Sequence, residues 1–180
     1  SYLNVSNLSI NLPNQELLLK NINFRLNSGD RLLIKGASGS GKTTLLRALA
    51  GLWPFASGEV SQNHAKTATF IAQRPYMPQV SLRQAICYPL TTNLPDDTEL
   101  LTIMRECGLA YLQPRLDEEV DWCKVLSLGE QQRVAFARVL VNHPDIIYLD
   151  EASSALDEAM EAHLYHVLSE RLPGSAIISV

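Results

Sequence analysis

A glycine-rich run near the N-terminus carries the residue types that bind phosphate groups. Residues 36–43 have the sequence GASGSGKT and lie between an apolar run (31–34) and a segment of helical character. Three glycines let the backbone curl so that successive N–H groups point at phosphate oxygens, and the following helix N-terminus adds to the attraction. Lys42 would reach the β- and γ-phosphates, and the Thr43 hydroxyl would coordinate Mg²⁺. The residues expected to bind a nucleoside triphosphate are Gly36, Ala37, Ser38, Gly39, Ser40, Gly41, Lys42, Thr43 and Thr44.

Two carboxylates follow a continuous apolar run later in the chain. Residues 146–149 indicate a strand that is covered on both faces, and Asp150 and Glu151 come directly after it. In a parallel sheet that end of a strand is where ligands bind. We expect Asp150 to hold Mg²⁺, directly or through water, and Glu151 to polarise an attacking water. The alternative is an ordinary solvated acidic turn, which a preceding phosphate loop disfavours.

A third segment, residues 126–133 with the sequence LSLGEQQR, predicts the start of a helix. Ser127 stands at the N-cap position and Glu130 at the capping-box position. The free N–H groups of that helix, the Ser127 hydroxyl and the Gly129 backbone would form a second anion-binding surface. Because one nucleotide does not need two γ-phosphate sites in one chain, this surface suggests a partner molecule. An ordinary capped helix is the alternative.

The bulk composition agrees with a globular domain that binds no nucleic acid. Hydrophobic residues make up 46% of the 180 residues and charged residues 19%, and the formal net charge of −4 gives no basic surface. Cys87, Cys107 and Cys123 form no CxxC pair, which favours a reducing compartment over a disulfide framework or a zinc site. No run approaches the roughly 20 apolar residues that cross a bilayer. The chain begins at Ser1, which suggests an excised piece or a processed product.

Strand and helix signals alternate along the chain. An antiparallel pair is expected around the turn signal Pro13-Asn14, and a short strand over 31–34 should be buried. The expected strands are 2–10, 17–26, 31–34, 68–72, 146–149 and 176–180, and the expected helical regions are 42–50, 81–112, 130–142 and a segment around Met160–Leu168.

This order predicts an α/β fold with a mostly parallel sheet, an N-terminal antiparallel β part and a helical insertion. We expect one domain over 1–180. Its core and antiparallel part would cover about 1–80 and 143–180, and its helical subdomain about 81–142.

The chain resembles the ABC ATPases over nearly its full length. LSLGEQQR resembles the family signature, with Ser127, Leu128, Gly129 and Glu130 as its central residues, and the order of the motifs is the order in the family. Gln73 is similar to the Q-loop glutamine, which in the family contacts Mg²⁺ and water and senses the membrane domain. The family's D-loop is matched by Ser154, Ala155, Leu156 and Asp157.

The resemblance implies an ATP hydrolase with Glu151, Gln73 and Lys42 as catalytic residues and Thr43, Gln73 and Asp150 as Mg²⁺ ligands. Two ATP molecules would lie between the phosphate loop of one subunit and the signature of the other in a head-to-tail dimer.

Finer features are similar to subfamily D, the peroxisomal fatty-acyl transporters, and to their bacterial SbmA- and YddA-like relatives. Residues 47–54 (RALAGLWP) and 73–78 (QRPYMP) carry this likeness. It implies a half-transporter whose ATPase domain follows a membrane domain on the same chain and forms a homodimer. The domain would then lie at the cytoplasmic face of a membrane, in bacteria the inner membrane.

Three departures from the family pattern matter. Leu128 and Glu130 stand where the signature usually has glycine and glutamine, although Ser127 and Gly129 remain. Leu12 aligns with the usual adenine-stacking aromatic residue, so a weaker apolar contact is expected there. The chain stops at Val180, before the family's switch histidine, so residues 1–180 should bind ATP and hydrolyse it poorly. His163 and His166 do not replace that histidine and are expected at the surface.

Two other functions remain open on the sequence alone. One is a soluble ABC ATPase that acts on nucleic acid or ribosomes, although residues 70–124 show no sustained heptads and no basic arm. The other is an ATP-gated interaction module that does not hydrolyse ATP. The transported substrate cannot be inferred from this chain, because the family selects it in the membrane domain.

Overall fold

The computed structural model describes residues 1–37 and 39–180. Contacts within the chain divide it into two compact units. The core unit comprises Ser1–Phe70, Pro144–Glu151 and Gly174–Val180, and the helical unit comprises Ile71–His143 and Ala152–Pro173.

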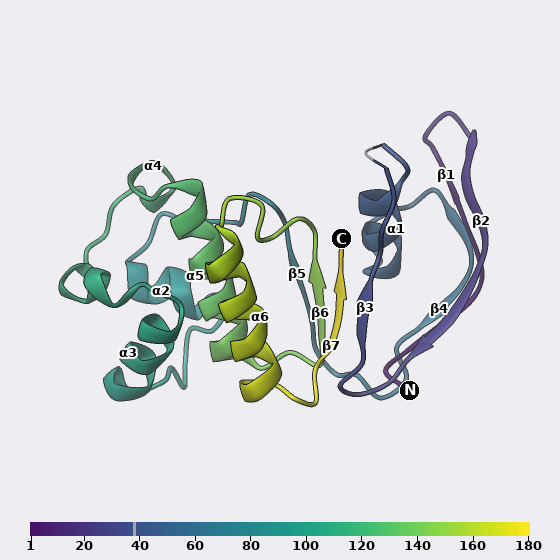
Figure 1. Cartoon of the computed structure of the whole chain (residues 1–180). Coiled ribbons are helices and arrows are strands. Elements are labelled where there is room, and N and C mark those ends of the chain that lie inside the picture. Colours follow the sequence, from purple (N-terminus) through teal and green to yellow (C-terminus); the bar gives the residue numbers. More distant parts are fainter. Residues whose placement is uncertain (38) are drawn as a thin grey trace. The chain divides into compact units, whose positions relative to one another are not determined.

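The core unit contains an antiparallel sheet with the order β2-β1-β4, in which β1 is Leu3–Asn11, β2 is Leu17–Leu26 and β4 is Ala56–Ser61 (Figure 1). The antiparallel pairing of β1 with β2 confirms the prediction from the Pro13-Asn14 turn signal. The strand β4 was missed, because its sequence ASGEVS is mostly polar and four of its six residues are exposed. It forms by pairing with β1. Gly58 lies so close to the backbone of β1 that a Cβ added at Gly58 would be 2.3 Å from the Asn7 carbonyl oxygen.

The second sheet of the core unit has the order β3-β7-β6-β5. Its strands are β3 (Arg31–Leu33), β5 (Ala68–Ile71), β6 (Ile146–Leu149) and β7 (Ala176–Ser179). Strand β7 pairs in parallel with both β3 and β6. Every residue of β6 and β7 is buried, as the apolar run over 146–149 predicted for β6.

The prediction that the strand over residues 31–34 is buried was wrong. The strand β3 lies at an edge of the sheet, and the side chain of Leu33 is 56% exposed. Strand β5, expected in the core, is buried fully only at Ile71. Apolar composition therefore identified the strands but not which of them are central.

The helix α1 (Lys42–Leu49) lies between the two sheets of the core unit (Figure 1). Its buried residues Leu46, Ala48 and Leu49 share one hydrophobic cluster with residues of β1, β6 and β7. This packing fixes the axis of α1, and so fixes where the helix N-terminus and the phosphate loop before it lie.

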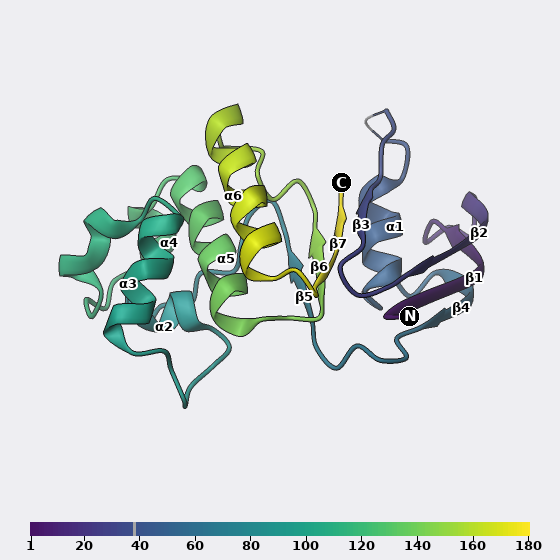
Figure 2. The ribbon, with the colours of Figure 1, turned by 60° about the horizontal axis from the view of Figure 1, so that its bottom comes forward.

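The helical unit is built around α5 (Leu128–Asn142), which packs against α2, α3 and α6 (Figure 2). Its other elements are α2 (Leu82–Cys87), α3 (Asp97–Glu106), the 3₁₀ helix η1 (Ala110–Arg115), α4 (Trp122–Val125) and α6 (Glu158–Arg171). The expected helical region 81–112 is therefore three short helices, and Pro89 and Pro95 lie between the first two of them. None of the helices in the described residues has both the length and the apolar character needed to span a membrane.

The α/β class, with a parallel sheet, an antiparallel N-terminal sheet and a helical part, is confirmed. His163 and His166 are exposed on α6, as expected.

Candidate functional site

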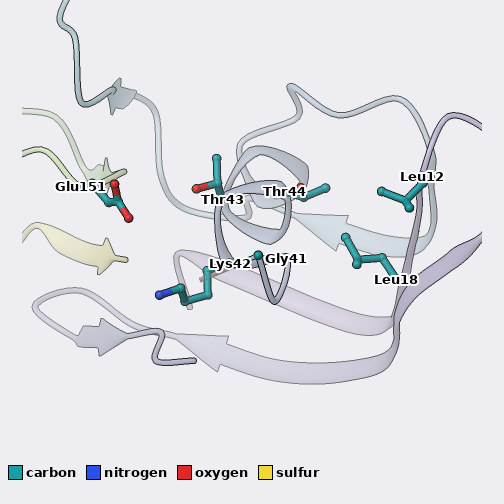
Figure 3. A pocket seen from close by; sticks show the side chains of 8 residues that line it. Leu12, Leu18, Gly41, Lys42, Thr43, Thr44 and Glu151 are labelled. Carbon is teal, nitrogen blue, oxygen red and sulfur yellow. The ribbon is translucent and has the colours of Figure 1, made fainter. Parts of the chain in front are cut away.

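The phosphate loop borders a cavity of about 420 Å³ in the core unit. Figure 3 shows Glu151 and the amine of Lys42 toward one end of this cavity, and Leu12 and Leu18 toward the other. The lining residues are Leu12, Leu18, Gly39, Gly41, Lys42, Thr43, Thr44 and Glu151. The cavity therefore has a polar, charged end and an apolar end, which suits a ligand with a phosphate chain and a base.

Backbone conformation at the loop exposes the N-terminus of α1. Gly39 and Gly41 have φ of 78° and 94°, a region that side chains disfavour. Gly41 is the N-cap residue, and no side chain caps the helix. The Leu45 N–H donates to the Gly41 carbonyl, so the N–H groups of the three residues before Leu45 precede the first helical bond. These donors and the helix dipole make a site for an anion.

Two side-chain contacts prepare the polar end of the cavity. Lys42 Nζ donates to the Gly36 carbonyl oxygen at 2.8 Å, which holds the ammonium group back over its own loop. The Thr43 hydroxyl donates to Asp150 Oδ1 at 2.9 Å, and only 7% of Asp150 is exposed. A hydroxyl and a carboxylate oxygen are ligands that Mg²⁺ prefers, and that ion completes its shell with water and substrate phosphates. The residues present therefore fit a magnesium ion held largely by the nucleotide.

Glu151 lies beside Asp150 in sequence but has a different environment. Its side chain is exposed and lines the cavity, and its backbone has φ of 50°, which is uncommon for a residue other than glycine. Its N–H donates to the carbonyl of Val180, the residue after β7, at 3.3 Å, and this contact helps to hold the conformation. The carboxylate is thus directed into the cavity while Asp150 stays buried beside Thr43.

The apolar end of the cavity agrees with the contact expected from Leu12 and adds Leu18 to it. Both residues flank the turn between β1 and β2. A Cβ on Gly41 would lie 2.9 Å from Leu18 Cδ2, so this leucine packs directly against the loop. The hairpin signal at Pro13-Asn14 could have identified Leu18, since residues on either side of a tight turn are neighbours.

Other residues of the expected phosphate site do not line the cavity. Gly36 accepts the hydrogen bond from Lys42, and Ala37 accepts one from the Ser40 N–H at 3.1 Å. A Cβ at Gly36 would lie 2.7 Å from Ser40 Oγ, so these residues support the shape of the loop. Ser38, also expected there, lies outside the described residues.

A second pocket, of about 400 Å³, lies in the helical unit at the N-terminus of α5. It is lined by Ser127, Gly129, Arg133, Ala155, Leu156, Asp157 and Met160. The structure thus brings together residues of the signature and the D-loop, which the sequence separates by more than 20 positions. Leu128 and Glu130, the two departures from the family pattern, are not among the lining residues.

The capping box predicted at this helix is confirmed. Ser127 Oγ accepts from the Glu130 N–H at 3.1 Å, and Glu130 Oε1 accepts from the Ser127 N–H at 2.9 Å. Because the Ser127 oxygen is the acceptor in this pair, its own hydrogen can still be donated to a ligand. A Cβ at Gly129 would lie 3.0 Å from the Ala155 carbonyl oxygen, so glycine permits the close approach of the D-loop.

Gln132 links the Q-loop and the D-loop to the signature helix, and the sequence did not single it out. Its amide nitrogen donates to the Gln73 carbonyl at 2.9 Å and to Ser154 Oγ at 3.0 Å, and its oxygen accepts from the Ala155 N–H at 2.9 Å. Gln73 Nε2 donates to the same Ser154 hydroxyl at 3.1 Å. Gln132 is fully buried. The available signal was a glutamine on the buried side of an amphipathic helix, where an amide must find partners.

The structure therefore groups the expected residues in two sets. Lys42, Thr43, Asp150 and Glu151 belong to the core unit, and Gln73 with the signature and the D-loop belongs to the helical unit. The role of Gln73 as a Mg²⁺ ligand beside Thr43 and Asp150 remains a prediction.

Comparison with known proteins places the chain in a family. Residues 19–154 match the family described as ABC transporter. The chain belongs to the ABC transporter family. It contains the ATP-binding domain of that family, with the P-loop fold, as the order of the motifs predicted.

Curated relatives support this membership along the whole chain. An uncharacterized ABC transporter ATP-binding protein of Haemophilus influenzae is 46% identical over 176 residues, which cover 98% of this chain and 30% of the relative. The inner membrane ABC transporter ATP-binding protein YddA of Escherichia coli is 36% identical, with 98% of this chain and 31% of the relative covered. The lysosomal cobalamin transporter ABCD4 of Homo sapiens is 38% identical, with 89% and 29% covered.

The predicted likeness to subfamily D and to YddA-like proteins is confirmed by these ABC relatives. The chain spans about 30% of the length of the three relatives named above.

Proposed function

We propose that this ABC domain binds ATP with Mg²⁺, hydrolyses the ATP, and powers a membrane transporter through ATP-dependent dimerisation. The observation that carries the proposal is the core-unit cavity, in which Lys42, Thr43 and Glu151 surround one space next to the uncapped N-terminus of α1. The chain would act as one ABC ATPase domain, with its helical subdomain at about residues 81–142.

ATP binding follows from the two ends of the cavity. The N–H groups of α1 and the Lys42 ammonium would bind the phosphate chain, and Leu12 and Leu18 would contact the base. Hydrogen bonds from charged groups to phosphate are roughly twice as strong as neutral ones, so the phosphate end dominates the affinity. An apolar contact made by two leucines offers no hydrogen bond to the base, so discrimination among purine nucleotides should be weak.

Hydrolysis would proceed by positioning and by electrostatic stabilisation of the transferred phosphoryl group. Bound Mg²⁺, held by Thr43 and Asp150, would neutralise charge on the phosphates. Glu151 would orient and polarise the attacking water, since its carboxylate is exposed in the cavity and is not engaged by Thr43. Lys42 would move from the Gly36 carbonyl to the γ-phosphate when ATP binds.

Dimerisation would complete the site. The pocket of Ser127 and Gly129 presents a hydroxyl and free N–H groups for an anion, but it belongs to a different compact unit from the phosphate loop. A second copy, placed head to tail, would bring this pocket to the γ-phosphate. ATP would then favour the closed dimer, and hydrolysis would remove that preference.

The transporter role is supported by the relatives, two of which are named as ABC transporter ATP-binding proteins and the third as a lysosomal cobalamin transporter. We propose that the chain works with a membrane domain of the same half-transporter as a homodimer. Its place would be the cytoplasmic face of a membrane, and in a bacterium the inner membrane, as the name of YddA states for that protein. None of the three relatives described above is named as an ATPase that acts on nucleic acid.

The test is ATP-dependent dimerisation of the Glu151→Gln variant of the 180-residue chain. With ATP and Mg²⁺ this variant should elute as a dimer in size-exclusion chromatography, and without nucleotide as a monomer. The control is the double variant Lys42→Ala/Glu151→Gln, which should remain monomeric. A Glu151→Gln protein that binds ATP and yet stays monomeric would rule out the sandwich mechanism.

A further inference from the structure

The segment Gly108–Tyr111 contacts two polar residues at the start of α5. The Tyr111 hydroxyl donates a hydrogen bond to Glu130 Oε2, and the Gly108 carbonyl accepts one from Arg133 Nη1 at 2.8 Å. Gly108 has φ of 71°, and a Cβ there would lie 2.9 Å from Arg133 Nη1. Glycine is therefore needed at position 108 to admit the guanidinium group, and the segment positions two charged side chains of opposite sign.

These two side chains differ in their access to the signature pocket. Arg133 lines the pocket together with Ser127 and Gly129, whereas Glu130 does not, although it lies between Gly129 and Arg133 in the sequence. Both carboxylate oxygens of Glu130 are engaged elsewhere, Oε1 by the Ser127 N–H and Oε2 by the Tyr111 hydroxyl. The carboxylate is thus held beside the pocket rather than in it.

The charge states of the pair agree with this arrangement. Partial burial alone would raise the pKa of Glu130, but the hydrogen bonds from Tyr111 and Ser127 and the nearby charge of Arg133 lower it overall. Burial and the contact with Glu130 raise the pKa of the Tyr111 phenol. Near neutral pH the pair is therefore a neutral phenol that donates to an ionised carboxylate.

The position of this negative charge matters for anion binding. The N-terminus of α5 attracts an anion through its free N–H groups and its dipole, and a carboxylate that turned toward them would oppose that attraction. The pocket already contains one carboxylate, Asp157, whose Oδ1 accepts from the Met160 N–H at 2.7 Å. With a second carboxylate, the pocket would contain two negative charges against the single positive charge of the Arg133 guanidinium.

We propose that Tyr111 is a positioning residue, which holds the Glu130 carboxylate out of the signature pocket so that Arg133 and the helix N-terminus can attract a phosphate group. The inference rests on the proposed function, since that phosphate is the γ-phosphate of the nucleotide bound by a second copy. It adds a residue outside the signature motif to the machinery of that site.

The first arm of the test measures the contact itself and needs no nucleotide. The side-chain carboxyl of Glu130 is followed by ¹³C NMR through a pH titration, and its resonance is assigned by its absence in Glu130→Gln. In Tyr111→Phe the pKa of Glu130 should rise toward its ordinary value, because a hydrogen bond to the charged form is lost. An unchanged titration would overturn the proposal. The matched control is Tyr76→Phe, which removes the hydroxyl of another exposed tyrosine of the helical unit.

The second arm measures ATP-dependent dimerisation in the Glu151→Gln background by sedimentation. Tyr111→Phe should weaken the dimer about two- to fivefold, the range expected for one charge near a helix terminus. Adding Glu130→Gln should remove this loss, since glutamine keeps the capping box without the charge. Tyr76→Phe should have no effect. If Tyr111→Phe dimerises like its parent, or Glu130→Gln gives no rescue, Tyr111 does not act through Glu130.

The two arms separate this inference from the proposed function. A parent that binds ATP but forms no dimer would show that the proposed sandwich is wrong. In that case the titration alone decides whether Tyr111 holds the carboxylate.

Discussion

Each of the two units of the chain contains a helix N-terminus for which we propose an anion-binding role, but the two N-termini are capped differently. The helix α1 of the core unit begins after Gly41 with no side-chain cap, so three N–H groups precede the first helical bond. The helix α5 of the helical unit begins with Ser127, whose side chain already accepts from the third N–H of the helix. The core unit therefore offers more free donors than the helical unit does.

The charged groups around the two helix N-termini also favour anion binding in the core unit over the helical unit. The core-unit cavity has the Lys42 ammonium and the Thr43–Asp150 pair that suits Mg²⁺. The side chains that line the signature pocket include one cation, Arg133, and one carboxylate, Asp157. This difference supports the proposal that the core unit binds the nucleotide on its own and that the helical unit complements a nucleotide bound by a second copy. The predictions below test this division.

The largest effect is expected from Glu151→Gln, which keeps the shape of the cavity and removes the carboxylate that polarises water. ATP hydrolysis by the chain, which is already expected to be slow, should fall about 10²- to 10⁴-fold further, the range for loss of a general base. ATP affinity should change little, because Glu151 is not expected to bind phosphate. Steady-state phosphate release and isothermal calorimetry measure the two quantities. Glu59→Gln, an exposed change on β4, is the control and should alter neither.

Lys42→Ala tests the claim that the core unit alone supplies ATP affinity. Loss of a hydrogen bond to a charged group costs about 1.5–3 kcal/mol, so the dissociation constant of ATP with Mg²⁺ should rise about 10- to 100-fold. Calorimetry on the monomeric chain gives the value. Lys20→Ala, an exposed lysine of β2, should bind ATP as the parent does. Affinity that survives Lys42→Ala unchanged would contradict the proposed phosphate site.

Gln132→Leu tests how the helical unit holds its loops together. The change removes three hydrogen bonds and leaves the Gln73 carbonyl and the Ala155 N–H without their partner. An unsatisfied buried group costs about 1–3 kcal/mol; because these two contacts are only partly buried, the helical unit should lose stability at the lower end of that range. Hydrogen exchange should accelerate at the Ala155 amide and remain unchanged in β6 of the core unit. The control is Gln113→Leu, at an exposed position of η1.

The smallest effect is a difference in alkaline stability between the units. Burial raises the pKa of Cys107, in the helical unit, from 9.0 to about 12, and that of Tyr148, in the core unit, from 10.0 to about 12. In both cases the unfolded chain loses its proton first, so the contribution to stability is complete below the unfolded pKa and decreases as pH rises toward the folded one. The helical unit should therefore begin to weaken near pH 9 and the core unit near pH 10.

Urea unfolding at pH 8 and pH 10 measures this difference. At pH 10, one unit above the ordinary pKa of the Cys107 thiol, a single such group costs about 1 kcal/mol. The free energy of unfolding should therefore decrease by about that amount between pH 8 and pH 10. Cys107→Ala removes the thiol and should reduce the decrease. An equal decrease in parent and variant would show that the Cys107 thiol does not set the alkaline stability.

The sequence predicted the elements whose signals come from adjacent residues, and it failed for those that depend on distant parts of the chain. The phosphate loop, the capping box at Ser127 and the buried strand β6 follow from residues adjacent in the chain, and each was predicted. Strand β4 exists because β1 accepts it as a partner, and its own residues are too polar to signal a strand. The exposure of Leu33 follows from the edge position of β3, which only the order of the sheet reveals.

The candidate site shows the same limit. Lys42, Asp150 and Ser127 belong to recognisable motifs, so the sequence predicted a role for each of them. Gln132 and Tyr111 act through partners that lie 19 to 59 residues away, and a glutamine or a tyrosine on a helix carries no motif of its own. Their contacts appear only once Ser154 and Glu130 are placed beside them.

The central claim is that one ATP is held by the core unit of one copy and the helical unit of another. Two variants, each in the Glu151→Gln background, test it by complementation. Lys42→Ala removes the phosphate-binding lysine, and Ser127→Asp keeps an N-cap but adds a carboxylate where the phosphate would lie. With ATP and Mg²⁺, sedimentation of either variant alone should show monomers. A mixture should form a dimer, weaker than the parent, because one intact site remains. A mixture that stays monomeric while the parent dimerises would contradict the claim.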